Sequence, residues 1–293
     1  METFWSQYQG HAELLAASAR LSGYDRVIAV GGDGTLFEVL NGLWREKKGD
    51  LPSVGMVPFG TGCDYIRNFD GGTSRIERLR AAMSPSAIRV SLGLCRTQAL
   101  EGRRERVFSM VLGLGFDAEV IRRFRTRRFR RAGWPAYAMS TLSAFRGLKS
   151  YAMSGSLNGS SFHTNAIFLG AALGCWFGKR IEIAPAASPA GNQFELVWVE
   201  PVGFLGLLSL VFRSYFGALQ RSPYIKRARA TRLSLDSTPP AWIEADGELI
   251  GKTPVEIEVI PGAFSFAAKA ARKLPMSVRK PRQSPSATPV HLP

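Results

Sequence analysis

Residues 27–43 read Val-Ile-Ala-Val-Gly-Gly-Asp-Gly-Thr-Leu-Phe-Glu-Val-Leu-Asn-Gly-Leu, and this stretch decides the fold. The apolar run from Val27 to Val30 predicts a buried parallel strand. It leads through a glycine turn into an amphipathic helical pattern that starts at Leu36. A strand, a glycine turn and a helix N-terminus form an anion site in α/β proteins, because free N–H groups and the helix dipole favour negative charge.

Asp33 is the unexpected residue of that turn. A carboxylate in an anion site is repulsive unless a cation lies between the two, and the simplest cation is the Mg²⁺ of a nucleotide. A plainer interpretation stays open, because Thr35 and Glu38 have the spacing of a capping box and glycines at a tight turn need no ligand. On local grounds the two interpretations weigh about equally.

A second glycine turn makes phosphate binding the better of these two interpretations. The apolar stretch Val54 to Val57 is followed by Gly60-Thr61-Gly62-Cys63-Asp64, which again leads from a strand end into glycines and a carboxylate. In an open parallel sheet both turns lie at the carboxyl ends of the strands, where ligands bind. Two convergent turns of this kind favour phosphate binding.

At this point the chain resembles the diacylglycerol kinase catalytic domain, which bacterial lipid kinases, sphingosine kinases and ceramide kinases share. NAD kinases share the first motif and the broader fold. The residues that carry the resemblance are Gly31-Gly32-Asp33-Gly34-Thr35 with Glu38 and Asn41, Gly60-Thr61-Gly62-x-Asp64, Gly115-Phe116-Asp117-Ala118-Glu119-Val120, Ile183-Ala184-Pro185-x-Ala187, and Ala245-Asp246-Gly247-Glu248 followed by Pro254 and Pro261-Gly262-Ala263.

The resemblance runs from about Gly10 to Lys269 and implies an α/β plus β fold like that of NAD kinase and diacylglycerol kinase. Residues 1–88 would form a Rossmann-like ATP-binding domain that lacks its first strand–helix–strand unit, and residues 89–273 a β-sandwich-like lipid kinase domain. The active site would lie between the two. Residues 274–293 are polar, basic and rich in proline, which predicts a disordered tail.

The resemblance also implies an activity: transfer of the γ-phosphate of ATP to a lipid hydroxyl, with diacylglycerol giving phosphatidic acid. Glu248 would be the general base and Asp33 a second catalytic residue, while Asp33 and Asp64 would hold Mg²⁺ or its waters. From the residues alone, Asp246-Gly247 before Glu248 is better explained as an ordinary hairpin turn. The implied nucleotide contacts are Gly31, Gly32, Asp33, Gly34, Thr35, Glu38, Gly60, Thr61 and Gly62.

Several positions depart from the family pattern. Cys63 stands where asparagine is frequent, and Ser91 stands where an aspartate would join the Mg²⁺ water network. The stretch from Gly191 to Glu195 replaces a pattern associated with a structural metal, so we assign no metal there. A catalytically impaired paralogue therefore stays open as an alternative function.

Composition sets further bounds. At 293 residues the chain favours two domains. Its cysteines, Cys63, Cys95 and Cys175, are scattered and lack metal-ligand spacing, which indicates a reducing, cytoplasmic compartment. The longest apolar stretch, Val202 to Phe212, is too short to span a bilayer and predicts a core helix.

The charge distribution indicates which part of the chain could bind an anionic surface. The net charge is +15, with −3 in residues 1–70 and +18 in the remainder. The densest run, Arg122 to Arg131, holds seven arginines with Phe124 and Phe129 between them. This favours an anionic phospholipid surface at the inner membrane face, where the lipid substrate would lie. A solvated helix face and a basic nucleic-acid-binding protein stay open, although no specific nucleic acid is expected, and a homodimer is compatible with the sequence.

The remaining elements follow from periodicity and turn signals. A helix is predicted from Ser74 to Met83, and another from Gly133 to Lys149. The predicted strands of the second domain are Ile88–Leu94, Val107–Gly113, Ala166–Leu173, Phe194–Val199, Thr231–Asp236, Ala241–Ala245 and Val255–Ile260.

Overall fold

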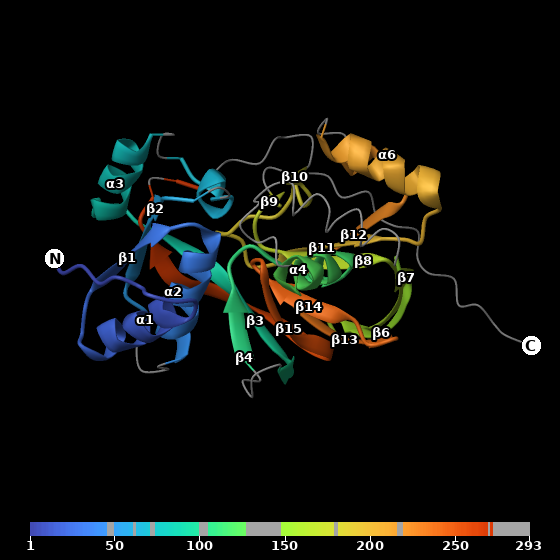
Figure 1. Ribbon diagram of the computed structural model, residues 1–293, viewed down its shortest axis with the longest axis horizontal. Helices are drawn as coiled ribbons and strands as arrows, with labels where there is room; N and C mark the ends of the chain where they lie inside the picture. Colours follow the sequence, from blue (N-terminus) through green and yellow to red (C-terminus); the bar gives the residue numbers. More distant parts are fainter. Residues whose placement is uncertain are drawn as a thin grey trace, which may run out of the picture.

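The structure is a computed structural model that describes residues 1–45, 50–60, 63–70, 74–99, 105–126, 148–178, 181–215, 219–268 and 270–271. The elements fall into an α/β part at the N-terminal end of the chain and a β-rich part that follows it (Figure 1). Strand β15 (Glu248–Phe266) belongs to both parts, and this strand positions the site described below.

The α/β part is built on two parallel strands, β1 (Arg26–Gly31) and β2 (Ser53–Pro58), with Val27 opposite Val54. Helix α3 (Arg75–Met83) packs on one face of these strands and α2 (Asp33–Arg45) on the other, and α1 (His11–Leu21) packs against α2 (Figure 1). The predicted strands and helices of this part are confirmed.

Helices α1 and α2 approach closely because α2 carries Gly42 at the contact. A Cβ on Gly42 would collide with the carbonyl oxygen of Glu13 on α1. The apolar side of α2 forms the core beneath them, with Leu36, Leu40 and Leu43 almost fully buried. This packing fixes the direction of α2 and therefore the position of its first residue, Asp33.

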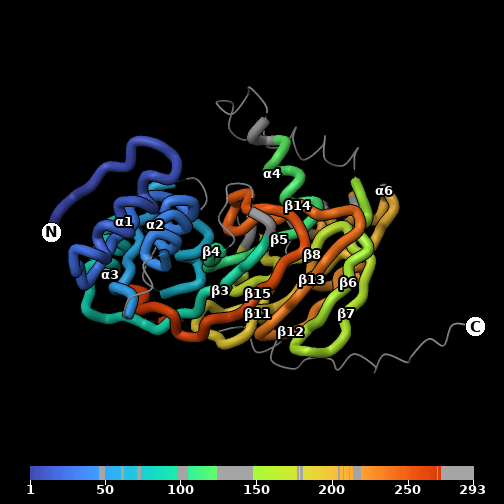
Figure 2. The backbone as a smooth tube through the Cα atoms, turned by 90° about the horizontal axis from the view of Figure 1, so that it is seen from below, coloured from blue at the N-terminus to red at the C-terminus, as the bar shows by residue number. Residues whose placement is uncertain are grey.

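The β-rich part is one large, strongly curved sheet (Figure 2). Its strands run in the order β12-β11-β8-β5-β14-β15-β13-β6-β7, and β3, β4, β1 and β2 join it through β15. The strands are β3 (Ile88–Ala99), β4 (Glu105–Phe108), β5 (Val111–Gly115), β6 (Tyr151–Leu157), β7 (Ser160–Ala166), β8 (Phe168–Ala172), β11 (Phe194–Val199), β12 (Ile225–Ala230), β13 (Arg232–Thr238), β14 (Trp242–Ala245) and β15 (Glu248–Phe266), with a separate pair β9 (Trp176–Phe177) and β10 (Ile181–Glu182).

Strand β15 is the connection between the two parts. It pairs antiparallel with β14, β13 and β3 along most of its length, and at its end Phe266 lies parallel to Val54 of β2. Figure 2 shows it running from the β-rich part into the α/β part. Glu248 is the first residue of β15. It therefore belongs to the same hydrogen-bonded sheet as β1 and β2, whose carboxyl ends lead into the two glycine turns.

Two differences from the predicted strands have local causes. The run Val107–Gly113 is interrupted at Ser109 and Met110, because their N–H groups turn toward the carboxylate of Asp246. The β6–β7 hairpin was not predicted, since its strands are mostly polar, although its Asn158-Gly159 turn is a recognised hairpin signal.

The helix predicted over Val202–Phe212 is present, but the prediction that it lies in the core is wrong. The observed helix α6 (Phe204–Tyr215) lies on the surface of the β-rich part (Figure 1). Leu205 is 78% exposed, and Leu208 and Phe212 are exposed with it. In the described part of the chain, no helix has both the length and the apolar character that crossing a bilayer requires.

Two predictions fall largely outside the described residues. Of the helix expected over Gly133–Lys149, residues 133–147 lie outside them, while residues 148–149 have no regular structure. The tail expected over 274–293 also lies outside them.

Candidate active site

The two glycine turns meet at the carboxyl ends of β1 and β2, as the sequence predicts. The N–H of Phe59 donates to the carbonyl of Gly31 at 2.9 Å. A Cβ on Gly60 would lie only 3.0 Å from the Cα of Gly32, so this close approach of the two turns favours glycine. Of the predicted nucleotide contacts, Thr61 and Gly62 lie outside the described residues.

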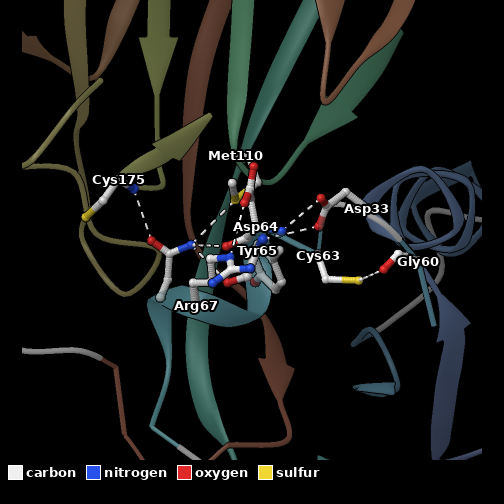
Figure 3. Close-up of polar contacts among 9 residues, drawn as sticks. Asp33, Gly60, Cys63, Asp64, Tyr65, Arg67, Met110 and Cys175 are labelled. Carbon is white, nitrogen blue, oxygen red and sulfur yellow. Dashed lines mark hydrogen bonds and ion pairs between the residues drawn. The ribbon is translucent and has the colours of Figure 1, made fainter. Parts of the chain in front are cut away.

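Asp33 joins the first turn to the second (Figure 3). It is the first residue of α2, and its Oδ2 and Oδ1 accept the N–H groups of Asp64 at 2.9 Å and Tyr65 at 3.1 Å. Burial raises the pKa of Asp33, and these two N–H groups oppose that rise because they favour the ionised form. The Asp33 carboxylate therefore links the turn after β1 to the turn after β2 by hydrogen bonds.

The residues after the second turn are anchored in the core. The ring of Tyr65 is fully buried, and it packs edge-on against Phe69 and Phe266 with 5.1 Å between centroids in each pair. Before it, Cys63 adopts φ 54°, and its Sγ lies 3.8 Å from the carbonyl oxygens of Gly31 and Gly60. Aromatic packing thus fixes the N–H groups that bind Asp33.

The second carboxylate of the motif, Asp64, lies beside the first. Its Oδ1 accepts the Nε of Arg67 at 3.2 Å, and its negative charge contributes to the raised pKa of Asp33. No group of three or more potential metal-ligating side chains occurs within the residues that the structure describes. Two adjacent carboxylates fit Mg²⁺, which is usually bound by one or two carboxylates together with substrate phosphates.

Thr35 and Glu38 do not form the capping box that the sequence admits. Thr35 lies inside the first turn of α2, where its side chain covers Gly31. Glu38 accepts the N–H groups of Gly10 at 2.8 Å and Ala12 at 3.1 Å, and so it caps the beginning of α1. A contact between Glu38 and the nucleotide stays a prediction.

The Asp246-Gly247 turn joins β14 to β15 as a hairpin, with φ 48° at Asp246 and 90° at Gly247. Asp246 accepts the N–H groups of Ser109, Met110 and Val111 at 2.7–3.0 Å, and also the Ser109 hydroxyl. Burial raises the pKa of Asp246 to about 6, although these hydrogen bonds favour its ionised form. The hairpin interpretation is correct, and the turn is in addition fixed by a buried carboxylate.

That hairpin brings Glu248 to the nucleotide turn. A Cβ on Gly34 would lie 4.0 Å from Glu248 Oε1, so the carboxylate faces the start of α2. Glu248 Oε2 accepts the side-chain N–H of Gln9 at 2.9 Å. The site therefore combines a glycine turn, the carboxylate pair of Asp33 and Asp64, and a third carboxylate supplied by the β-rich part.

Asn68 is a site residue that sequence reasoning missed. Its Nδ2 donates to the carbonyl of Tyr65 at 2.9 Å and lies 3.5 Å from the Sδ of Met110, and its Oδ1 accepts the N–H of Cys175 at 3.0 Å. One buried amide thus ties the second turn to two segments of the β-rich part. A single asparagine in a short 3₁₀ turn gives no pattern that predicts this.

Ser91 and Glu195, which depart from the family pattern, are held by protein contacts. The hydroxyl of Ser91 donates to the carbonyl of Gly191 at 2.5 Å and accepts the N–H of Gly262 at 3.2 Å. Glu195 accepts the N–H of Ala186 at 2.7 Å and pairs with Arg227 at 3.0 Å. These contacts fix the loop that contains Ala186 and Gly191, which precedes β11.

Only the beginning of the arginine-rich run can be placed. Arg122 and Arg123, on α4 (Phe116–Thr126), both pair with Glu119 at 2.7 Å, and the Arg122 hydrogen bond is the main reason that the pKa of Glu119 falls to about 2. The positions from Arg127 to Arg131 lie outside the described residues.

Comparisons with known proteins agree with this architecture. Residues 1–95 match the diacylglycerol kinase catalytic domain, and residues 110–268 match the YegS C-terminal NAD kinase beta sandwich-like domain. A crystal structure of a protein from Bacillus anthracis, provisionally described as a diacylglycerol kinase, superimposes with a TM-score of 0.71 at 20% sequence identity. The superposition covers 90% of this chain and 84% of that one, which shows a shared fold.

Curated relatives cover most of the chain as well. The Bacillus subtilis protein YtlR, provisionally named a lipid kinase, is 28% identical over 272 residues, which is 88% of this chain and 86% of that protein. The diacylglycerol kinase of Bacillus subtilis is 24% identical over 247 residues, 84% of this chain and 78% of the enzyme. Together with the two matched domains, which between them include both glycine turns and the Glu248 hairpin, these findings show that the chain belongs to the diacylglycerol kinase family of lipid kinases.

Proposed function

We propose that this protein transfers the γ-phosphate of ATP to the hydroxyl of diacylglycerol and so forms phosphatidic acid. The observation that carries the proposal is the position of Glu248, a carboxylate of the β-rich part, against Gly34 in the nucleotide turn of the α/β part. Phosphoryl transfer requires such an arrangement, because the hydroxyl that attacks must lose its proton close to the bound phosphates.

Each part of the site has a role in this proposal. The N–H groups of the turn from Gly31 to Thr35 and of the turn at Gly60 bind the phosphates, and Asp33 and Asp64 hold Mg²⁺. Mg²⁺ bound there would neutralise the charge on the phosphate oxygens. Glu248 accepts the proton of the lipid hydroxyl, and Gln9 orients the Glu248 carboxylate through its hydrogen bond.

The acceptor of this reaction lies in a bilayer, so the proposal includes a membrane contact. We assign it to the arginine-rich run Arg122–Arg131, which would bind anionic phospholipid at the inner face of the cytoplasmic membrane. Arg122 and Arg123 are already paired with Glu119, so the later arginines of the run carry more of this attraction.

The test is the formation of phosphatidic acid by the purified protein from ATP, Mg²⁺ and vesicles that contain diacylglycerol and phosphatidylglycerol. Glu248→Gln should lower kcat by about 10²–10⁴-fold with unchanged ATP binding. Glu256→Gln is the matched control, because Glu256 lies exposed on the same strand. ATP binding without any product would identify an impaired paralogue, and phosphorylation of another lipid alcohol in place of diacylglycerol would correct the acceptor.

A further inference from the structure

A pair of carboxyl groups lies buried behind the Glu248 hairpin. Glu244, on β14, is fully buried, and Asp117, in the first turn of α4, is 8% exposed. Both occupy the space over Gly113 of β5, where a Cβ would collide with Asp117 Oδ2 and would lie 2.7 Å from Glu244 Oε1. Two carboxyl oxygens gathered around one point repel each other strongly if both groups are ionised.

Within the residues that the structure describes, the surroundings of the pair supply no positive charge that pairs with either carboxyl group. In the described part of the chain, no arginine, lysine or histidine forms an ion pair with Asp117 or Glu244. Burial raises the pKa of Asp117 to about 6. Within the described residues, Asp117 Oδ1, Asp117 Oδ2 and Glu244 Oε1 are buried without a hydrogen-bond partner. Burial, followed by repulsion from Asp117, raises the pKa of Glu244 well above its usual range.

The other titratable groups on the elements around the pair do not neutralise it, because they are bound to other groups or are not positively charged. Arg122 and Arg123 of α4 are paired with Glu119, and Asp246 at the turn adds negative charge that also favours a protonated Glu244. Among the described residues, Tyr151 on β6 and Glu248 at the start of β15 supply no positive charge, and Lys252 of β15 stacks over the ring of Trp242.

The second oxygen of Glu244 reaches the hairpin. Glu244 Oε2 accepts the N–H of Gly247 at 2.7 Å, and Gly247 immediately precedes Glu248. Glu244 therefore places one oxygen on the side of Asp117, over Gly113, and binds the turn that carries Glu248 with the other. Loss of the shared proton would place two negative charges together and push the two groups apart, and Glu244 would then release the turn.

We propose that Asp117 and Glu244 share one proton, held on Glu244 Oε1 and donated to Asp117, and that Glu244 is thereby a positioning residue for Glu248. The inference rests on the proposed role of Glu248 as general base. It adds a pair of residues that do not touch the reacting atoms but hold the turn on which the base is mounted.

The first experiment follows amide hydrogen exchange at Gly247 as a function of pH, which requires no kinase activity. In the unmodified protein the protection of Gly247 should fall at alkaline pH, when the pair loses its proton. Glu244→Gln should keep the protection at alkaline pH, because the amide can accept from Gly247 and donate to Asp117 without a titratable proton. Glu244→Ala should lower the protection about tenfold at every pH.

The second experiment compares kcat and the KM for ATP in the same variants. Glu244→Gln should retain kcat at neutral pH and should weaken the alkaline decline of kcat, whereas the KM for ATP stays unchanged. Asp117→Asn should likewise weaken the alkaline decline. Glu256→Gln is the control that should leave the profile unchanged.

Unchanged Gly247 exchange and unchanged pH profiles in Glu244→Gln would overturn the proposal. If Glu244→Ala does not fold, the comparison of Glu244→Gln with the unmodified protein still decides it. The expected exchange pattern in a protein without any kinase activity would support the proton-sharing pair and refute the proposed function, so the two failures are distinguishable.

Discussion

Glu248 and Gly34 face each other across the two parts of the molecule, with Glu248 Oε1 only 4.0 Å from the point where a side chain on Gly34 would begin. The space between them is where a phosphate on the glycine turn and a hydroxyl near the carboxylate would have to meet. Alterations on either side of this space should therefore affect catalysis more than folding.

Gly34→Ala tests this directly. A methyl group at Gly34 makes only an ordinary van der Waals contact, and alanine in a helix is favoured by up to about 1 kcal/mol, so stability should be kept or raised. The value of kcat/KM should fall by about tenfold or more, because the methyl group displaces the reacting groups. Gly42→Ala is the contrasting variant: its Cβ collides with the Glu13 carbonyl, and thermal unfolding should show a loss of about 1–3 kcal/mol.

Asp33→Asn should lower kcat by about 10²–10³-fold, because the variant keeps one acceptor for the second turn but loses the charge that binds Mg²⁺. Steady-state kinetics across a range of Mg²⁺ concentrations measures the effect. Asp25→Asn is the control, since Asp25 lies exposed at the other end of β1. Full activity of Asp33→Asn at saturating Mg²⁺ would show that the metal assignment is wrong.

Ser91→Ala should destabilise the protein by about 1–3 kcal/mol, because it leaves the Gly191 carbonyl and the Gly262 N–H without their hydroxyl partner. Chemical denaturation gives the free energy of unfolding. The kcat of the folded variant should stay close to that of the unmodified protein. A large fall in kcat at full stability would instead support a catalytic role at this position.

Glu244→Gln should change how stability depends on pH. A carboxyl group whose pKa is raised by folding stabilises the folded state below its unfolded pKa, about 4.3 for glutamate, and this contribution is lost as pH rises through the folded pKa. The variant has no such proton to lose. Its stability relative to the unmodified protein should therefore increase by on the order of 1–3 kcal/mol between pH 5 and pH 8. Equal differences at the two pH values would contradict the raised pKa.

Membrane binding should depend on the arginine-rich run. We expect co-sedimentation with vesicles that contain acidic phospholipid and not with neutral vesicles, and we expect salt to weaken it, because the Debye length falls from about 10 Å at 0.1 M to about 3 Å at 1 M. Replacing the seven arginines from Arg122 to Arg131 with glutamine should abolish the binding.

Two outcomes would count against this contact. Equal binding to neutral vesicles would point to an apolar surface such as the exposed side of α6, where Leu205 and Phe212 lie. Stronger salt-sensitive binding to duplex DNA than to acidic vesicles would favour the nucleic-acid alternative.

The elements that the sequence predicts well are those with a strong local pattern. The strand–turn–helix around Asp33 and the second turn before Asp64 were predicted because glycines and apolar runs specify them within a few residues. The proposed role of Glu248 is implied by the family resemblance alone, since its local pattern indicates only a hairpin. The structure brings these three carboxylates to one site.

What the sequence could not predict depends on contacts between distant residues. Glu38 caps a helix that begins more than twenty residues earlier, and Asn68 reaches Cys175, 107 residues away. The pairing of Asp117 with Glu244 depends on a sheet that places β5 beside β14. The surface position of α6 was missed because an apolar run gives no information about whether the rest of the fold covers it.

The continuity of β15 has a consequence for how the two parts of the molecule can move relative to each other. Domains joined by a flexible linker can swing freely, but here one strand of 19 residues is paired within both parts of the molecule. Its ladder with β3 shifts register between Ile260 and Phe264, around Pro261-Gly262-Ala263. A bulge is where a paired strand bends most easily. Any relative movement of the two parts should therefore be a small flexing of this strand at Gly262, and not a hinge rotation of independent bodies.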